Sequence, residues 1–505
     1  MKIKTGSRTK TFLVVIFLIL LDLFIVMGSS LNPFSKVVPS IDSSVFIYMG
    51  QRLRDGAVPY RDAFDHKGPL LYTIEWLGLT IGNGSTVGIW VIEFISMLFF
   101  LYFMYKTAKL FTESDIIAAS SVTFGTELLM NSFENGNFSE EYALPFIAFS
   151  LYVFLKYIYK DEVKYRYVAV AGACCGCVLL LRANMVSVWA AWAVVVIVMM
   201  IINSNITAKE KLLQIIKLIL FFTAGIIAAI SPFVIWYACK GALKIMYDTY
   251  IGSNMLYVGG NPHSISSVAN VIKTYSHMMV QTTYIILLYI IAVICWSYHC
   301  KNSKKMLVIW GNVFYIIVTM YLVSVSGRNY SHYLMVFTPC LMLSLVLMLD
   351  SFRNNCVPKM PARYWSFLLI VAAVLFYAGP FRSQISTISA TMIGNEENDK
   401  LIAEIKRITS KEDEVFVLNN RVCFLVKTDR HTNFRYEFAP DFIDVQDDTI
   451  KYLTDDKPKV IVKLIKYEDG TNAKISSIDE CAEKMCSDGI YTAEKSDYAI
   501  LYIRN

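Results

Sequence analysis

The chain has 505 residues, of which 55% are hydrophobic, 14% aromatic and only 17% charged. Soluble domains carry about 25% charged residues, so this composition excludes an ordinary soluble enzyme and indicates an integral membrane protein. The formal net charge is +6, but in a membrane protein the placement of Lys and Arg between spans matters more because it sets orientation. Nothing in the charge predicts a nucleic-acid partner.

The N-terminus combines a basic head, MKIKTGSRTK, with a long apolar run, TFLVVIFLILLDLFIVMG. A signal peptide begins in the same way, but no small-x-small cleavage site follows this run. We therefore predict an uncleaved first span whose basic end is cytoplasmic.

A highly charged loop, residues 30–68, follows the first span. Its ionisable residues are Asp42, Arg52, Arg54, Asp55, Arg61, Asp62, Asp65, His66 and Lys67. The loop is too charged to cross a bilayer, so we place it outside. The next apolar run, 69–82, contains Glu75 and is shorter than the roughly 20 residues that a span needs, which predicts a helix lying on the outer interface. If that helix crossed the membrane, every later side assignment would invert.

Ten further apolar runs predict spans with basic clusters on one side. They cover about 87–110, 115–133, 141–159, 166–182, 185–203, 213–237, 281–299, 306–325, 333–349 and 365–380. The predicted fold is an α-helical multi-pass membrane protein with about eleven spans. Residues 1–385 form its transmembrane domain, and residues 390–505 form a small soluble domain outside the membrane.

The soluble tail has the patterns of a small α/β domain. A helical period runs through LIAEIKRI (401–408), and strand-like runs are EVFVLNN (414–420), KPKVIVKLI (457–465) and YAILYIRN (498–505). Mixed helix and strand signals of this length favour a small α/β domain.

In this topology, charged and polar residues from distant parts of the chain share the outer face. Besides the first loop, they are Glu134, Glu140, Glu141, Arg182, Arg328, Tyr330 and His332. A carboxylate can act as a general base or bind a cation, and arginines fork onto phosphate oxygens. Acids and arginines at one membrane level are what chemistry on a phosphorylated lipid requires.

Structural roles compete with chemical ones at each position. Asp42 precedes a helical run and is open to N-capping, while Asp62 and Asp65 are open to a role in solvating the loop. Lys67 is open to anchoring at the lipid headgroups. Glu140 and Glu141 are equally open to stabilising the positive end of a helix.

The arginines are harder to explain structurally. Arg182 and Arg328 are closely flanked by apolar runs. An arginine in such surroundings is costly unless it is paired or functional.

The order of these motifs resembles the C-type (GT-C) membrane glycosyltransferases, and within them the RgtA/B/C/D-like and PMT/ArnT-like bacterial branch. The likeness covers the membrane part of the chain. It rests on the Asp after the first span, the acidic second loop and two short motifs: Gly56-x-x-Pro59-Tyr60-x-Asp62-x-x-Asp65-x-Lys67-Gly68-Pro69-Leu70 and Gly327-Arg328-x-Tyr330-x-His332-Tyr333.

The resemblance implies an inverting sugar transferase that takes its donor from polyprenyl phosphate at the outer face. It implies Asp42 as the catalytic base and Glu140 or Glu141 as the acid that assists the acceptor or a metal. The candidates for holding the lipid phosphate are Lys67, Arg182 and Arg328. Further candidate substrate-binding residues are His332, Tyr330, Asp62, Asp65 and His66.

The leading prediction is a glycosyltransferase of the cytoplasmic membrane that serves assembly of a cell-surface glycan or glycolipid. A protein acceptor is less favoured, because Ser43 stands where protein mannosyltransferases carry a second acid beside the first. No cofactor is assigned, and a divalent metal stays open. The alternatives are a lipid or polysaccharide transporter or flippase, which should place ionisable residues near mid-membrane on broken helices, and a glycan polymerase or ligase using a lipid diphosphate.

Overall fold

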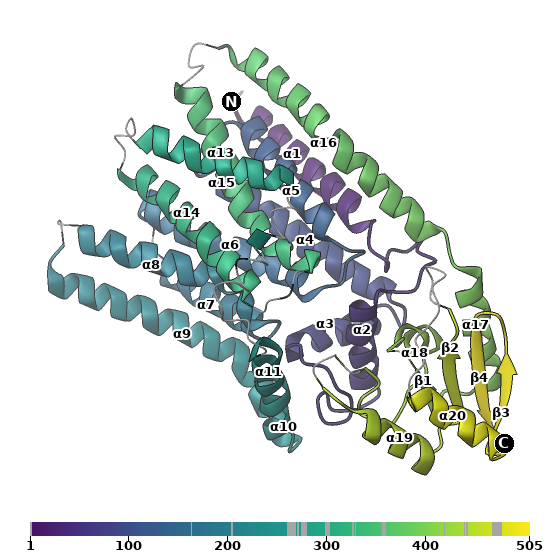
Figure 1. Ribbon diagram of the computed structural model, residues 1–505. Helices are drawn as coiled ribbons and strands as arrows, with labels where there is room; N and C mark the ends of the chain where they lie inside the picture. The colour runs from purple at the N-terminus through teal and green to yellow at the C-terminus, as the bar shows by residue number, and fades with distance from the viewer. Residues whose placement is uncertain are drawn as a thin grey trace. The chain divides into compact units, whose positions relative to one another are not determined.

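The computed structural model describes most of the chain, which is largely helical (Figure 1). The described residues are 3–162, 164–203, 206–259, 280–297, 303–325, 330–355, 360–418, 420–438, 443–466 and 477–505, with the isolated positions 269, 272–273, 328 and 440. Gly327 and Asn329 of the second motif lie outside them.

Each of the eleven predicted spans coincides with a helix. These helices are α1 (Ile3–Val26), α4 (Val87–Ala108), α5 (Asp115–Ser132), α6 (Ser139–Lys160), α7 (Tyr165–Leu179), α8 (Ser187–Ile202), α9 (Ala208–Cys239), α13 (Val280–Ser297), α14 (Ser303–Ser324), α15 (Thr338–Asn355) with the preceding 3-10 helix η3 (Ser331–Phe337), and α16 (Ala362–Met392). Hydrophobic runs of this length therefore predicted the helices well.

Six of the helical stretches in the described ranges are long and apolar enough to cross a membrane. They are Val87–Ala108, Ser139–Lys160, Ala183–Ile202, Ala208–Cys239, Ser303–Ser324 and Ser331–Asn354. On α9, Leu212, Ile219, Leu220 and Ile227 are 58–62% exposed, and side chains of this kind are stable when lipid covers them. The chain is thus a multi-pass membrane protein, and the count of eleven spans stays a prediction.

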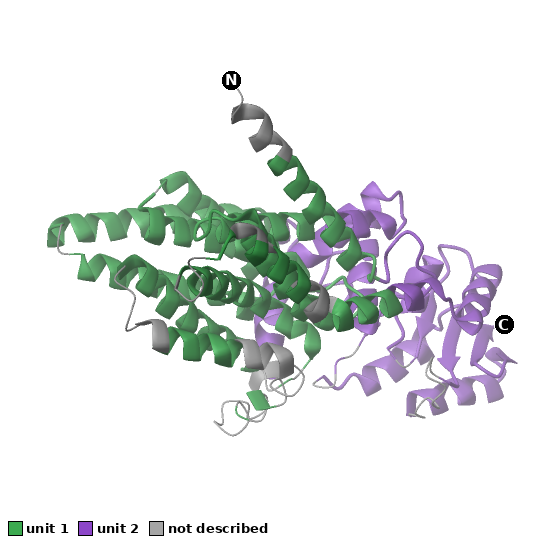
Figure 2. Cartoon of the chain, turned by 90° about the horizontal axis from the view of Figure 1, so that it is seen from above, with its two compact units in different colours: residues 1–29, 93–233, 258–387 green, residues 30–92, 234–257, 388–505 purple. Residues whose placement is uncertain are grey.

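By contacts, the chain divides into two compact units, each assembled from three segments (Figure 2). Unit 1 comprises Met1–Ser29, Glu93–Phe233 and Val258–Thr387, and unit 2 comprises Ser30–Ile92, Val234–Tyr257 and Ile388–Asn505. The predicted boundary between 385 and 390 concerns the membrane, and it stays a prediction.

Unit 2 contains the first loop, which folds as two helices. They are α2 (Ile41–Arg54) and α3 (Pro69–Ile81). Gly50 allows them to approach closely, because a Cβ there would lie 2.5 Å from the Cβ of Glu75. The predicted helix at 69–82 is therefore present, and its length of 13 residues is too short to span a membrane.

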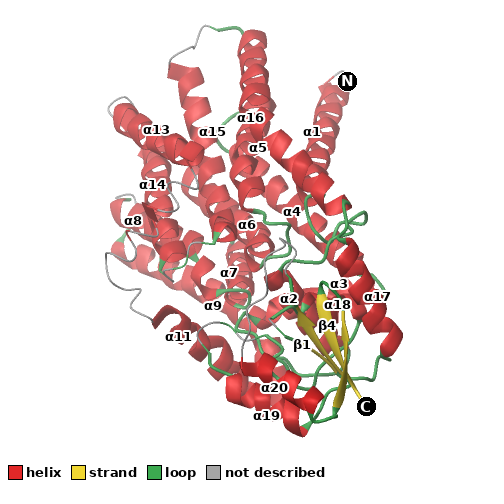
Figure 3. Cartoon of the chain, turned by 45° about the vertical axis from the view of Figure 1, so that its right-hand side comes forward, coloured by secondary structure: helices red, strands yellow, loops and turns green. Residues whose placement is uncertain are grey.

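The C-terminal part of unit 2 holds a four-stranded sheet (Figure 3). The strands β1 (Val415–Val417), β2 (Val460–Leu464), β3 (Tyr491–Lys495) and β4 (Ala499–Arg504) lie in the order β1-β2-β4-β3. β1 pairs with β2 in parallel, and the other pairings are antiparallel. Its helices are α17 (Glu396–Ile408), α18 (Cys423–Thr428), α19 (Gln446–Asp455) and α20 (Ser477–Ser487). The small α/β domain is confirmed in class, and β3, α18, α19 and α20 are additions to the prediction.

The helix α2 of the first loop packs against this domain within unit 2. Gln51 donates from Nε2 to the carbonyl of Val426 over 3.1 Å, and Arg54 forms a 2.8 Å ion pair with Asp429. Two segments nearly 400 residues apart along the chain thus form one compact body.

Candidate functional site

Unit 1 contains an unusual loop immediately before α6. Four successive residues have positive φ: Glu134 (45°), Asn135 (68°), Gly136 (77°) and Asn137 (65°). This conformation is strained for residues other than glycine and persists only when surroundings hold it. Here the Asn137 amide N–H donates to Glu141 over 2.9 Å, and the Tyr142 hydroxyl donates to the Asn137 side chain over 2.8 Å. Glu141 therefore holds the loop backbone.

Its neighbour Glu140 forms a buried ion pair with Arg182. The Arg182 Nη1 lies 2.5 Å from Glu140 Oε1, and the two residues are 8% and 2% exposed. The Ser139 hydroxyl donates to the second Glu140 oxygen over 2.8 Å. The guanidinium also stacks on the ring of Tyr333, 3.9 Å from its centroid. A buried carboxylate is tolerable when charged and hydrogen-bonding partners meet both oxygens, as they do here.

His332 extends this cluster through η3. Its Nδ1 lies 2.9 Å from Glu134 Oε2, and its ring stacks on Phe138 with centroids 4.3 Å apart. The ring of Tyr330 also stacks on His332, with centroids 5.6 Å apart, and is exposed. An imidazole beside a carboxylate can hold or pass a proton.

The structure thus brings together, within unit 1, residues that the sequence placed in separate outer features. We call Glu134, Glu140, Arg182, His332 and Tyr333 the acid–arginine cluster. Arg328 is described, partly buried, and lies four residues before His332. The cluster offers two carboxylates, a guanidinium and an imidazole to one region, which suits recognition of a polar or phosphorylated ligand.

Unit 2 places Asp42 in the first turn of α2, where it is half-buried. Ser40 is the N-cap, since its side chain accepts from the Ser43 amide over 3.3 Å. The capping role open to Asp42 therefore belongs to Ser40. In the described part of the chain, no hydrogen bond or ion pair engages the Asp42 carboxylate.

Asp65 is buried, and both of its carboxylate oxygens accept hydrogen bonds from neighbouring residues. Its oxygens accept from the His66 amide over 2.7 Å and from the Tyr72 hydroxyl over 2.9 Å. Burial raises the pKa of the Asp65 carboxyl, but the hydrogen bonding and charge of His66 outweigh it, and the pKa lies below its usual range. Asp65 therefore stays ionised inside the loop.

Lys67 lies two residues after Asp65, and hydrogen bonds hold its backbone carbonyl. Its carbonyl accepts from the Tyr60 hydroxyl over 2.7 Å and lies 3.0 Å from the Tyr72 hydroxyl, whose single hydrogen it shares with Asp65. Its ammonium lies 3.4 Å from His66 Nε2 and 5.8 Å from the centroid of the Phe46 ring. Within the described ranges, no carboxylate lies close enough to form an ion pair with it, although the charge of Lys67 helps to lower the pKa of the Asp65 carboxyl.

Asp62 has a different environment at the surface of the loop. Arg61 donates two hydrogen bonds to its carboxylate, of 2.8 and 2.9 Å, and the Val58 amide donates a third over 2.7 Å. These contacts, Arg61 first, lower the pKa of the carboxyl. They close a turn of the loop.

Sequence reasoning missed Glu437, which the C-terminal domain contributes to unit 2. It is 3% exposed, and neither oxygen has a hydrogen-bond partner of standard geometry among the described residues. Burial raises the pKa of Glu437 well above its usual range, and the negative charge of Asp65 adds to this. The stretch RYEFAP carries no motif that signals such a position.

A polar hollow also joins the loop to the C-terminal domain within unit 2. It measures about 440 Å³, and Arg52, Arg61, Asn433 and Arg435 line it with Asp55 and Asp62. No three His, Cys, Asp or Glu side chains in the described ranges are arranged to hold a metal ion, so we assign no metal ligands.

The fold is that of the C-type membrane glycosyltransferases. The chain matches ArnT from Cupriavidus metallidurans bound to undecaprenyl phosphate with a TM-score of 0.61 and 11% identity, over 99% of this chain and 98% of that one. It also matches the archaeal oligosaccharyltransferase AglB from Archaeoglobus fulgidus, in complex with an inhibitory peptide and a dolichol-phosphate, with a TM-score of 0.51 and 10% identity, over 98% and 74%. The predicted resemblance is therefore confirmed in fold.

More narrowly, the chain belongs to the family described as competence-induced protein Ccs4 N-terminal domain, whose model matches residues 2–376. A search of curated proteins finds no match.

Proposed function

We propose that this protein is a membrane glycosyltransferase that moves a sugar from a polyprenyl-phosphate donor to a cell-surface glycan or lipid acceptor, with inversion. The observation that carries the proposal is the match along nearly the whole chain to ArnT bound to undecaprenyl phosphate. A fold can host several functions, so the residues must carry the chemistry.

Transfer from a phosphate needs a base for the acceptor proton and positive charge for the leaving phosphate. Asp42 suits the base because no described contact occupies its carboxylate. Lys67 suits the phosphate because its backbone carbonyl is held by hydrogen bonds and its ammonium forms no ion pair among the described residues. Arg182 is already neutralised by Glu140, so we assign this pair to shaping the acceptor side. His66, Tyr330, Arg328 and His332 remain proposed substrate contacts.

The packing of α2 against the C-terminal domain supports the proposed topology. Charge patterning places the first loop and residues 390–505 outside independently, and within unit 2 the two share hydrogen bonds such as that of the Thr432 amide to Tyr48 Oη at 3.1 Å. We therefore place the N-terminus in the cytoplasm, the C-terminal domain outside, and the chain in the cytoplasmic membrane.

The positions of the buried acids within helices bear on the transporter alternative. Asp22 lies four residues from the end of α1, Glu93 six from the start of α4, and Glu127 five from the end of α5. Asp22 is thus nearer the end of its helix than the middle, whereas Glu93 and Glu127 are nearer the middle of α4 and α5, the region where transporter sites are found, so the vesicle experiment below must separate the two functions.

The test is to incubate the purified full chain with a panel of polyprenyl-phosphate sugars and candidate acceptors and to measure release of polyprenyl phosphate. The proposal expects release by the wild type and its loss in Asp42→Asn. Asp55→Asn is the matched control, since Asp55 lies in the same loop and is exposed. Release only from lipid diphosphates would support a polymerase or ligase. Movement of labelled lipid across vesicles without any release would support a transporter.

A further inference from the structure

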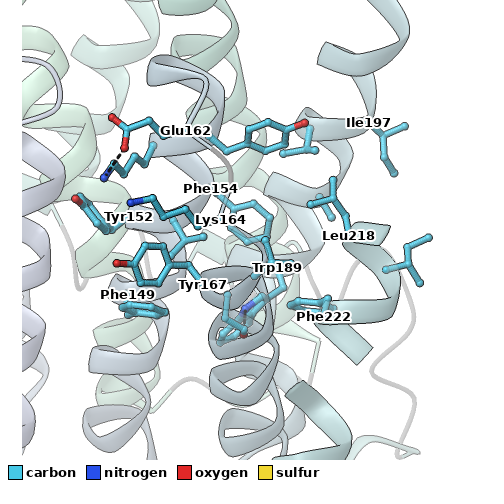
Figure 4. A pocket seen from close by; sticks show the side chains of 18 of the residues that line it. Phe149, Tyr152, Phe154, Glu162, Lys164, Tyr167, Trp189, Ile197, Leu218 and Phe222 are labelled. Atoms are coloured by element: carbon cyan, nitrogen blue, oxygen red, sulfur yellow. Dashed lines mark hydrogen bonds and ion pairs between the residues drawn. The ribbon is translucent and has the colours of Figure 1, made fainter. Parts of the chain in front are cut away.

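A second cavity lies wholly within unit 1, among α4, α6, α7, α8 and α9. It measures about 450 Å³, and most of its wall is apolar. Phe149, Trp189, Leu218 and Phe222 are among the side chains that line it (Figure 4). A cavity of this size and lining has the properties of a site for an apolar ligand.

The cavity is amphipathic because charges gather at one end. Figure 4 shows Glu162 and Lys164 at one end and Trp189 and Phe222 towards the other. Lys106 and Lys156 also line it, and Lys156 forms a 2.7 Å ion pair with Glu162. Because three lysines and one glutamate lie at this end, it carries a net positive charge.

Near the apolar end, α7 and α9 are in tight contact. A Cβ at Gly172 would lie 2.0 Å from the Phe222 carbonyl oxygen, and one at Gly225 would lie 1.9 Å from that of Ala169. Glycines at such a crossing let two helix backbones touch. The cavity therefore has a basic end and an apolar end near which α7 and α9 touch.

This cavity is separate from the acid–arginine cluster. Both contain residues of α6, but Glu140 lies in its first turn and Lys156 only four residues before its end at Lys160. At 1.5 Å per residue, about 24 Å of helix separates them. A ligand at the lysines is thus at the other membrane level.

We propose that this cavity binds one anionic glycerophospholipid, with its phosphate at Lys106 and Lys164 and an acyl chain running towards Trp189 and Phe222. Basic pockets between transmembrane helices on the cytoplasmic side bind anionic headgroups, and in the proposed topology the ends of α4 and α6 are cytoplasmic. The lipid covers apolar surface of α9 and holds that helix against α7. This inference does not depend on the glycosyltransferase proposal.

The test uses Trp189 as a reporter in the full chain, reconstituted in phosphatidylcholine nanodiscs. A minor fraction of phosphatidylglycerol or phosphatidylcholine with brominated acyl chains is added, and quenching is measured. Subtracting the signal of Trp189→Phe isolates Trp189. We expect brominated phosphatidylglycerol to quench Trp189 more strongly than brominated phosphatidylcholine, with the preference falling about fivefold for each of Lys106→Gln and Lys164→Gln.

Lys160→Gln is the matched control, because Lys160 is exposed at the end of α6, four residues before Lys164, and does not line the cavity. It should keep the full preference. Equal quenching by both lipids, or an equal loss in Lys160→Gln, would overturn the proposal. Stronger quenching by a brominated polyprenyl phosphate than by phosphatidylglycerol would assign the cavity to that lipid instead. Size-exclusion profiles show whether each variant is folded, and native mass spectrometry of retained phospholipid provides a second reading of occupancy.

Discussion

The acid–arginine cluster of unit 1 and the first loop of unit 2 use charge in opposite ways. In the cluster, Glu140 and Arg182 are buried and neutralise each other. In the loop, Asp42 and Lys67 have no described ion-pair partner of opposite charge. A closed pair mainly stabilises and shapes a site, whereas an open charge remains available to a ligand. The comparison predicts that mutations in the Glu140–Arg182 pair mainly affect folding and that those at the two loop charges affect turnover.

The largest effect is expected for Asp42→Asn. Removal of a general base costs about 10²- to 10⁴-fold in turnover, and stability should change little because no described contact is lost. Release of polyprenyl phosphate and thermal unfolding in detergent measure the two quantities on the same sample. Unchanged turnover would remove Asp42 as the base and leave the loop's chemistry to another group.

Arg182→Met should have the reverse effect of Asp42→Asn, with a large loss of stability. It leaves the Glu140 carboxylate buried without its cation, which costs about 3–5 kcal/mol of stability. The double variant Glu140→Gln/Arg182→Met should recover much of this loss, because no buried charge remains. Denaturant unfolding of the single and double variants measures the difference. If both are equally unstable, the pair is not the source of the effect.

Lys67→Met should weaken binding of the donor lipid without unfolding the loop. Loss of a charge-assisted hydrogen bond costs about 1.5–3 kcal/mol, or roughly 10- to 100-fold in affinity for undecaprenyl phosphate. Lys67→Arg should keep most of the affinity, since it keeps the charge. Calorimetric titration of the lipid in detergent measures the affinities. Equal affinities for wild type and Lys67→Met would move the phosphate site to Arg182 or Arg328.

Glu437 makes the stability of the chain depend on pH. Its pKa is raised by burial, then by Asp65, so the folded state holds a proton that the unfolded state releases near its ordinary pKa of about 4.3. The stabilisation is complete below that pKa and falls as pH rises towards the folded pKa, by up to about 1.4 kcal/mol per pH unit. Glu437→Gln should remove this fall and be the more stable form at neutral pH. Glu412→Gln, at an exposed acid, should leave the pH profile of unfolding unchanged.

Hydrophobic runs predicted the membrane helices because helix burial in lipid is a property of local composition. The site was predicted less completely because the role of each residue depends on the direction in which its side chain points. Glu140 and Glu141 are neighbours that point about 100° apart on a helix, so one meets Arg182 and the other holds the loop, and only the structure shows which. Glu437 had no signal at all, since its burial is set by packing with the distant first loop.

Strand β3 was missed for a related reason. Its sequence, YTAEK, has one buried residue followed by four exposed ones, so it lacks the alternation that marks a half-buried strand. Its pairing with β4 supplies the hydrogen bonds that define it. Edge strands of this polar kind resist edge-to-edge aggregation.

The smallest effect is expected for Asp62→Asn, which tests whether every acid of the first loop contributes to turnover. Arg61 and Asp62 are 46% and 31% exposed at their side chains, and exposed pairs of this kind contribute about 0–1 kcal/mol. Because the Val58 amide can still donate to the Asn oxygen, the turn should persist and turnover should stay near that of the wild type. Arg61→Met is the matched variant on the other side of the pair. A loss of turnover in Asp62→Asn comparable to that in Asp42→Asn, with Arg61→Met unaffected, would show that Asp62 contacts substrate. The difference in effect on turnover would then separate the whole first loop from unit 1. It would not separate the unpaired charges of the loop from the paired ones.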